Sequence, residues 1–266
     1  HVGVSPGARE EAAAAVGGRA TLHELSLDDA WARDAGPTVV QDGHGGRVAL
    51  DWIFNGWGGR FGPFARDDRA AAQVASWFGV PAERRGVAIE GGGLHGDGRG
   101  RLFSTEAAQT KTPSFLARLL GTARGAVEAE LLAATGAGHL VALPCAMTGD
   151  DTGGHIDVIG APAPGGVFLL HRPTSNEDPD RRGMADNEAA LREQSPDLEI
   201  VPVEAPTVAR TAAGERLPYS YLNFYLANGL VVVPSFGDRN DCRVRDRFHE
   251  LFPGRAVETV DARPFY

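Results

Sequence analysis

Lysine and cysteine are both scarce in this chain. Its 266 residues include one lysine, Lys111, and two cysteines, Cys145 and Cys242. The two cysteines stand in different contexts and match neither a zinc-site spacing nor a disulfide framework, which favours a reducing, cytoplasmic setting. The single lysine beside many arginines and alanines indicates a GC-rich coding bias, and we assign it no function.

Long apolar runs and basic blocks are missing as well. No apolar run approaches the ~20 residues that span a bilayer, and the N-terminus lacks the charged-then-apolar pattern of a signal peptide. The 26 basic residues are outnumbered by 35 acidic ones, which gives a net charge of -9 at pH 7. The sequence therefore argues against a nucleic-acid or membrane partner, and a small cationic substrate fits its charge better.

The hydrophobic content of 42% is ample for a folded core, and no low-complexity linker divides the chain. We therefore expect one domain over residues 1–266. The pattern runs strand, strand, helix, strand and returns about every 50 to 60 residues, which is typical of a repeat or propeller-like α/β architecture. Strands are predicted at 2–4, 21–27, 38–40, 48–54, 87–89, 102–105, 167–171, 198–203 and 256–260, and helices at 9–16, 70–78, 114–120, 126–134, 185–194 and 244–252. The segments 140–143 and 230–234 are apolar.

The densest group of chemically capable residues lies at 149–157, directly after an apolar run. Within it, His155 and Asp157 are two residues apart. On an extended backbone they point to the same side and can face one cationic group together. The glycines before His155 suit a pocket wall better than an ordinary strand. The alternative is an acidic turn that contains a histidine by chance.

Two earlier stretches place acidic residues in unusual surroundings. Arg33 and Asp34 lie between Trp31 and a Gly-Pro turn, where the alternative is a surface ion pair beside a packed tryptophan. Glu90 ends an apolar strand and opens a triple glycine that does not match a phosphate-binding loop. Such a carboxylate is partly buried, and buried charges are normally paired. Trp57, in a glycine-rich aromatic segment, is expected at the rim of a site.

Taken in order, three stretches resemble the agmatine deiminase and bacterial peptidylarginine deiminase family of guanidine-modifying enzymes. They are Asp29-Ala30-Trp31-Ala32-Arg33-Asp34-Ala35-Gly36-Pro37, Glu90-Gly91-Gly92-Gly93-Leu94-His95 and Asp151-Thr152-Gly153-Gly154-His155-Ile156-Asp157, supported by 221–229 and Phe236-Gly237-Asp238. The resemblance covers nearly the whole chain. It implies the pentein fold, a five-bladed α/β propeller of ββαβ units.

The resemblance also implies a role for each matching residue. Asp34 and Asp157 would grip the substrate guanidinium, because two carboxylates can form charge-assisted bonds with its fork of donors. His155 would be the general acid and base, and Glu90 would orient it and keep it protonated for the first step. Further substrate contacts are expected from Trp31, Arg33, Trp57 and Asn223. No metal and no cofactor are implied.

Two departures from the family pattern stand out. The family nucleophile is a cysteine in a glycine-rich stretch about a dozen residues beyond the final strand, and Cys145 and Cys242 do not stand in that context. We therefore expect the start and the cysteine segment of the domain to lie outside these 266 residues. The family's Asn-Arg-Asn-Pro-like stretch is replaced by Gln109-Thr110-Lys111-Thr112-Pro113, which puts part of the substrate rim in doubt.

The function predicted from this resemblance is a cysteine-dependent amidinohydrolase. The resemblance implies agmatine as the guanidine substrate, converted to a ureido product, N-carbamoylputrescine, and ammonia through a covalent amidino-thioether. Alternatives are a deiminase of peptidylarginine or another guanidine, an amidinotransferase, and a non-catalytic guanidine-binding propeller. A manganese-dependent ureohydrolase using His155 and Asp157 is a further class. The oligomeric state stays open, and a homo-oligomer is among the options.

Overall fold

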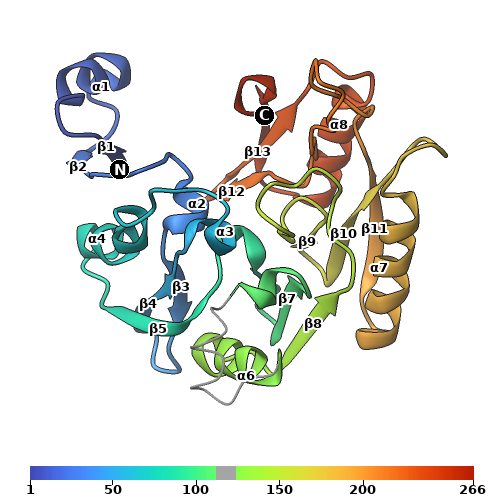
Figure 1. Cartoon of the computed structure of the whole chain (residues 1–266), viewed down its shortest axis with the longest axis horizontal. Helices are drawn as coiled ribbons and strands as arrows, with labels where there is room; N and C mark the ends of the chain where they lie inside the picture. The colour runs from blue at the N-terminus through green and yellow to red at the C-terminus, as the bar shows by residue number, and fades with distance from the viewer. Residues whose placement is uncertain (112–123) are drawn as a thin grey trace. The chain divides into compact units, whose positions relative to one another are not determined.

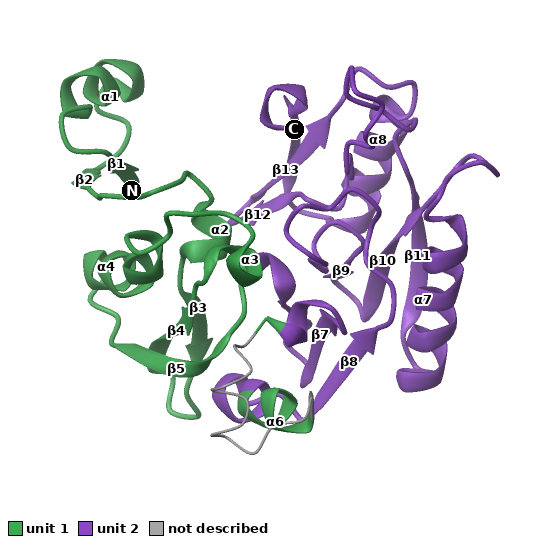
Figure 2. Cartoon of the chain, viewed as in Figure 1, with its two compact units in different colours: residues 1–91, 111–130 green, residues 92–110, 131–266 purple. Residues whose placement is uncertain are grey.

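The structure is a computed structural model that describes residues 1–111 and 124–266. The predicted helix 114–120, together with Thr112 and Pro113, lies outside the described residues. Two compact units make up the chain, one of residues 1–91 and 111–130 and the other of residues 92–110 and 131–266 (Figure 2). We call them the first and the second unit. The expectation of a single domain over residues 1–266 stays a prediction.

Four three-stranded mixed sheets share one order of elements in the described part of the chain (Figure 1). In each, a pair of antiparallel strands is followed by a helix and then by a strand parallel to the middle one. The predicted ββαβ rhythm is therefore confirmed. The four sets are β3 (Thr38–Gln41), β4 (Arg47–Ile53), α4 (Ala70–Trp77) and β5 (Ala82–Ala88); β6 (His95–Gly96), β7 (Arg101–Thr105), α6 (Arg124–Thr135) and β8 (His139–Leu143); β9 (Gly160–Ala163), β10 (Val167–Arg172), α7 (Arg181–Gln194) and β11 (Glu199–Glu204); and β12 (Tyr225–Ala227), β13 (Leu230–Ser235), α8 (Asp241–Leu251) and β14 (Ala256–Asp261).

The remaining elements are short and lie mostly in the first unit. At the N-terminus, β1 (Val2–Val4) pairs in parallel with β2 (Leu22–Glu24) across α1 (Arg9–Val16). Two one-turn helices, α2 (Ala32–Ala35) and α3 (Gly56–Gly59), carry residues that the sequence marked as candidates. Single turns of 3-10 helix occupy Asp67–Arg69, Gly91–Gly93, Ala108–Thr110 and Arg263–Phe265.

Helix α8 illustrates how the sequence attaches a helix to its sheet. Val244 and Phe248 lie four residues apart and Phe252 follows at the same spacing, so the three side chains share one face. All three are buried, in one cluster with Val231 and Val233 of β13. The apolar face of α8 is therefore the face that covers its sheet.

The predicted elements agree with the structure except where an element is very short or begins early. α1 has the predicted bounds, and every predicted strand is present within a few residues. α7 begins at Arg181 rather than at 185, because the Met184 N–H already donates to the Asp180 carbonyl at 2.8 Å. The strands β6, β9 and β12 were not predicted, and β8 and β13 coincide with segments noted only as apolar. Gly160-Ala161-Pro162-Ala163, for example, has little strand propensity and is held by its pairing with β10.

The mixed α/β class is confirmed by these sheets, and the five-bladed closure stays a prediction. Among the helices of residues 1–111 and 124–266, none combines the length and the apolar character that crossing a bilayer requires.

Candidate functional site

The candidate residues fall into two sets, one in each unit. In the first unit, the predicted Arg33-Asp34 segment forms α2, one helical turn before the Gly36-Pro37 turn. The Trp57 indole N–H donates to the Asp34 carboxylate at 2.9 Å. Asp34 and Trp57, expected separately from the sequence, are thus brought into direct contact.

Trp57 is held in an unusual backbone conformation. Its φ of 56° makes it the only non-glycine residue with a positive φ in the described part of the chain. This conformation is uncommon for a bulky side chain and is retained where the surroundings enforce it, often at functional sites. The ring is 6% exposed and packs edge-on against Phe54 and Phe61, with centroid distances of 5.0 and 5.6 Å. The strained backbone therefore aims the indole N–H at Asp34.

Glu90 follows β5 and is fully buried, with 0% of its surface exposed. The next residue, Gly91, lies against α2, because a Cβ on Gly91 would come within 2.1 Å of the Arg33 carbonyl oxygen. Glycine is needed for this close approach of two backbone segments. The turn that begins with Glu90 is in this way packed directly beside the helix that carries Asp34.

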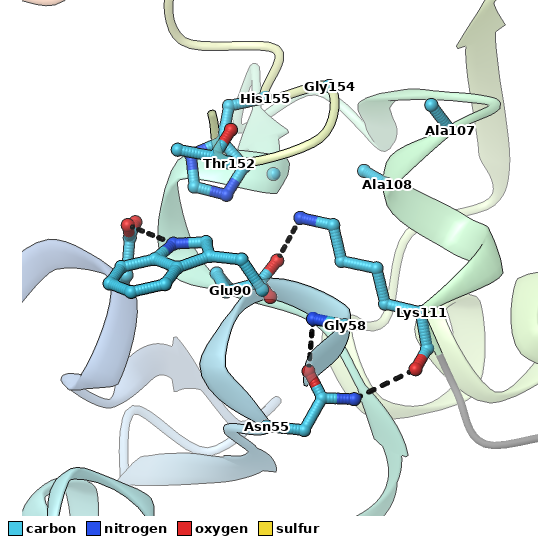
Figure 3. A network of polar contacts seen from close by, with 12 residues as sticks. Asn55, Gly58, Glu90, Ala107, Ala108, Lys111, Thr152, Gly154 and His155 are labelled. Carbon is cyan, nitrogen blue, oxygen red and sulfur yellow. Dashed lines mark hydrogen bonds and ion pairs between the residues drawn. The ribbon is translucent and has the colours of Figure 1, made fainter. Parts of the chain in front are cut away.

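Lys111 is the residue of this set that the sequence did not reveal. Its ammonium lies 2.5 Å from a Glu90 carboxylate oxygen, and the two side chains are 5% and 0% exposed (Figure 3). The chain's single lysine is therefore one half of a buried ion pair. Lys111 lies in the 109–113 stretch that departs from the family pattern. This departure is the only feature of the sequence that could have pointed to Lys111 as a residue of the site.

Asn55 connects Lys111 to the loop that carries Trp57. Its side-chain amide donates to the Lys111 carbonyl at 2.9 Å, and its side-chain oxygen accepts from the Gly58 N–H at 2.7 Å (Figure 3). Both sides of the amide are thus used inside the first unit. This amide helps to hold the Lys111 backbone and the α3 turn in fixed positions.

In the second unit, one carboxylate shapes the loop that carries His155. Asp150 accepts hydrogen bonds from the N–H groups of Gly154 and His155, both at 2.9 Å, and from the backbone and hydroxyl of Thr152 at 2.9 and 2.6 Å. Four donors therefore converge on one side chain to which the sequence analysis assigned no role. Asp150 is therefore a structural acid that fixes the backbone of this loop.

His155 and Asp157 lie close together, but not on the extended backbone that the sequence analysis assumed. Residues 151–159 form turns and bends, and β9 begins only at Gly160. The assumption of an extended segment is wrong, because the Asp150 bonds curl the chain. The His155 Nδ1 is nevertheless 3.9 Å from an Asp157 carboxylate oxygen, and the two residues are 3% and 2% exposed.

Glycine is required at position 154, directly before His155. It has a φ of +114°, and a Cβ would lie 2.7 Å from the Ala107 Cβ. The Thr105 hydroxyl, at the end of β7, donates to the Gly154 carbonyl. The N–H of Asp157 donates to the Gly92 carbonyl at 3.2 Å, so the same loop is also tied to the triple glycine that follows Glu90.

The other residues predicted to contact the substrate are exposed at the surface or partly buried. Trp31 is 49% exposed and Arg33 is exposed. Asn223 is half-buried in the second unit, shortly before β12, and its N–H donates to the Ser220 carbonyl at 3.4 Å. A role of these three residues in substrate binding stays a prediction.

Neither cysteine has the surroundings of a nucleophile. Burial, followed by the negative charges of Asp186 and Glu106, raises the pKa of the Cys145 thiol, which disfavours the reactive thiolate. The Cys145 backbone is bound on both sides by the Asn187 amide at 2.9 Å. Cys242 is exposed on α8. Over residues 1–111 and 124–266, no group of three or more His, Cys, Asp and Glu side chains has the arrangement of a metal site.

Comparisons with known proteins bear on the fold and the family of the chain. A family model described as Porphyromonas-type peptidyl-arginine deiminase matches residues 1–266. A Streptomyces coelicolor protein named "Putative agmatine deiminase" is 38% identical over 276 residues, covering 98% of this chain and 78% of the relative. A Streptomyces avermitilis protein of the same name is 37% identical over 272 residues, covering 98% of this chain and 77% of the relative.

Solved structures share the fold. The agmatine deiminase of Enterococcus faecalis superposes with a TM-score of 0.88 at 24% identity, covering 98% of this chain and 77% of that one. A Porphyromonas gingivalis protein, solved as a "Putative Arginine Deiminase", gives a TM-score of 0.89 at 26% identity, covering 100% of this chain and 80% of that one. The α/β fold expected from the sequence resemblance is confirmed by these two superpositions.

Proposed function

Because the chain belongs to the Porphyromonas-type peptidyl-arginine deiminase family, we propose that it is a cysteine-dependent hydrolase of guanidines with agmatine as its substrate. The products are then N-carbamoylputrescine and ammonia. The names of the two Streptomyces relatives support agmatine over an arginine within a peptide. The observation that carries the proposal is the Asp34 carboxylate, which the indole of the strained Trp57 holds at 2.9 Å.

In this proposal Asp34 and Asp157 bind the guanidinium. A guanidinium presents its N–H donors in a planar fork, and carboxylates accept such donors in pairs. The Trp57 indole fixes the direction of Asp34, while Asp157 is 2% exposed on the loop tied to the Gly92 carbonyl. Both carboxylates are thus held by their own units before a substrate arrives, which lowers the entropic cost of binding.

His155 carries the proton transfers. A thiolate attacks the guanidinium carbon and forms a C–S bond, and the C–N bond to one nitrogen breaks as His155 gives that nitrogen a proton, so that ammonia leaves. Water then adds to the amidino carbon while His155 takes its proton. The C–S bond breaks, which releases the ureido product and restores the thiolate. An Asp157 carboxylate oxygen lies 3.9 Å from the His155 Nδ1.

The thiolate is assigned to a cysteine in the family's glycine-rich context rather than to Cys145 or Cys242. The raised pKa of Cys145 and the exposed position of Cys242 on α8 support this assignment. Glu90 is proposed as the carboxylate that orients His155, as the resemblance implies. The Lys111 ammonium compensates its charge.

The test measures ureido product and ammonia from agmatine with the complete gene product. Replacing Asp34 or Asp157 by Asn removes a charge-assisted bond that is worth on the order of 2–5 kcal/mol when buried. We therefore expect kcat/KM to fall by well over tenfold in each variant. The control is Asp246→Asn, an exposed position on α8, which should keep full activity.

Near-normal turnover in either site variant would remove that residue from the proposed site. Release of putrescine with transfer of the amidino group to an added amine, and with neither ammonia nor ureido product, would indicate an amidinotransferase instead. Loss of activity on dialysis against EDTA, with recovery in Mn(II), would favour the ureohydrolase class over a thiolate mechanism, for which chelation should have no effect.

A further inference from the structure

A cleft of about 660 Å³ lies in the second unit, among residues that the proposed chemistry does not use. Its volume falls within the range of small-molecule sites. It is formed where the chain leaves β10 and β11 and enters α7 and α8, all in the purple unit of Figure 2. Its lining consists of Arg172, Pro173, Thr174, Arg181, Glu204, Arg239, Asn240 and Arg243.

The lining is strongly basic although the whole chain has a net charge of -9. Of its four arginines, only Arg243 has its charge matched, by an ion pair with Glu204. Arg172 and Arg181 make no ion pair or side-chain hydrogen bond with any residue of 1–111 or 124–266, and Arg239 interacts electrostatically with Asp238, its neighbour in the chain. Three guanidinium groups therefore keep donors for a ligand.

Two helices begin at this cleft. Arg181 is the first residue of α7, and Asn240 precedes the first residue of α8. Neither helix has a capping side chain that accepts a hydrogen bond from its first turn. The N–H groups of Arg181 and Asp241 donate to the Asp178 and Asp238 carbonyls, both at 3.1 Å. The other N–H groups of a first helical turn and the positive end of the helix dipole favour bound anions.

The acidic side chains near the two helix starts are already engaged. The Asp180 carboxylate lies 2.8 Å from the buried Arg216 guanidinium, and its other oxygen accepts from Thr148. The Asp241 carboxylate accepts from the Tyr221 hydroxyl at 2.6 Å. Asp238 accepts from the N–H groups of Thr207 and Asn240, both at 2.8 Å. These bonds direct the three carboxylates to protein donors.

From this arrangement we infer that the cleft binds a small anion carrying phosphate groups. Guanidinium forks and helix N-termini are the groups that recognise phosphate oxygens most often. The three unmatched arginines suit a ligand with two or three negative charges. A cationic guanidine is repelled by the same charges, so the cleft selects a ligand different from the proposed substrate.

The experiment titrates pyrophosphate into the complete gene product by calorimetry, with citrate as a carboxylate of similar charge. We expect saturable binding of pyrophosphate, tighter than that of citrate, and a loss of at least tenfold in affinity in Arg172→Gln and Arg239→Gln. Matched controls are Arg192→Gln on α7 and Arg247→Gln on α8, both paired with a glutamate of their own helix. These should bind as the unchanged protein does.

A second variant, Thr174→Glu, adds a negative charge to the lining without removing an arginine. It should abolish the binding. The proposal is overturned if pyrophosphate does not bind saturably, if the control variants lose affinity equally, or if citrate binds as tightly. Turnover of agmatine by the same variants separates the two proposals, since their activity should be retained whatever the anion result.

Discussion

At the scale of single residues, the Glu90–Lys111 pair is the most consequential contact. Breaking a buried ion pair by removing one partner costs about 3–5 kcal/mol, because the remaining charge stays buried. We expect Lys111→Met to lower the free energy of unfolding by this amount in urea titrations. Lys111→Arg keeps the positive charge and should recover most of the loss.

The exposed Arg245→Met on α8 is a suitable control for the loss of one positive charge. If Lys111→Met were as stable as the unchanged protein, the ion pair would not stabilise the fold. If Lys111→Arg were as unstable as Lys111→Met, shape rather than charge would decide the site.

His171 on β10 predicts a pH dependence of stability. Burial, and next the Arg216 charge, lower its pKa from 6.5 to about 4, and only its Nδ1 faces a partner, the Ser220 hydroxyl, at 3.3 Å. Between these two pH values the unfolded chain binds a proton that the folded protein does not. The free energy of unfolding therefore decreases as the pH falls from 6.5 to about 4, by on the order of 3 kcal/mol from this residue.

The measurement compares urea unfolding at several pH values in the unchanged protein and in His171→Gln. The variant lacks the titrating ring, so its stability should change less over the window. His44→Gln, at an exposed turn, should leave the pH dependence as it is. If the free energy of unfolding changed equally with pH in all three proteins, this would contradict a depressed pKa for His171.

At the scale of elements, the His155 loop depends on a glycine that has no space for a side chain. Gly154→Ala places a Cβ 2.7 Å from the Ala107 Cβ at a φ of +114°. We expect a loss of stability and a lower kcat, because the next residue is His155. Gly165→Ala is a matched control, since Gly165 has a φ of +87° but nothing within 4 Å of its Cβ.

In both variants an alanine must adopt a positive φ, which lowers stability. The difference in stability and turnover between the two variants therefore reports the contact with Ala107. It is measured by thermal unfolding and by agmatine turnover. Equal stability and equal turnover in the two variants would mean that the loop can shift to accept the methyl group.

How much of these elements could be predicted depends on whether the signal is local. The helices and the longer strands of the four sets follow mostly from apolar periodicity, as in α8, where Val244 and Phe248 share a face. Glu90 and the His155 loop stand out because charged residues adjoin glycines. Lys111 does not stand out, since its partner lies 21 residues away and only the fold brings them together. The turns at 151–159 could not be foreseen either, because they depend on where the Asp150 side chain points.

At the scale of the whole molecule, the net charge of -9 should attract the doubly charged agmatine. Electrostatic attraction of this kind is screened as the Debye length shrinks from about 30 Å at ~0.01 M salt to about 3 Å at ~1 M. We expect kcat/KM for agmatine to fall several-fold over this range. Initial rates at low substrate concentration measure the effect.

An uncharged osmolyte at equal osmolality is the control, and it should leave kcat/KM unchanged. Unfolding curves at both salt concentrations show whether the protein itself remains intact. A rate that does not depend on salt would mean that the negative charges lie too far from the site to guide the substrate.

The sheets have a consequence for how the chain folds. In each of the four three-stranded sheets, every strand pairs only with strands of its own ββαβ set, as Ala49 does with Ala82 and Val167 with Glu199. Among the described residues, strand pairing in these four sheets therefore closes loops of a few tens of residues and joins no strands of different sets. Short loop closures cost less entropy and speed folding. Each set can thus form soon after its own last strand leaves the ribosome, before the next set has been synthesised.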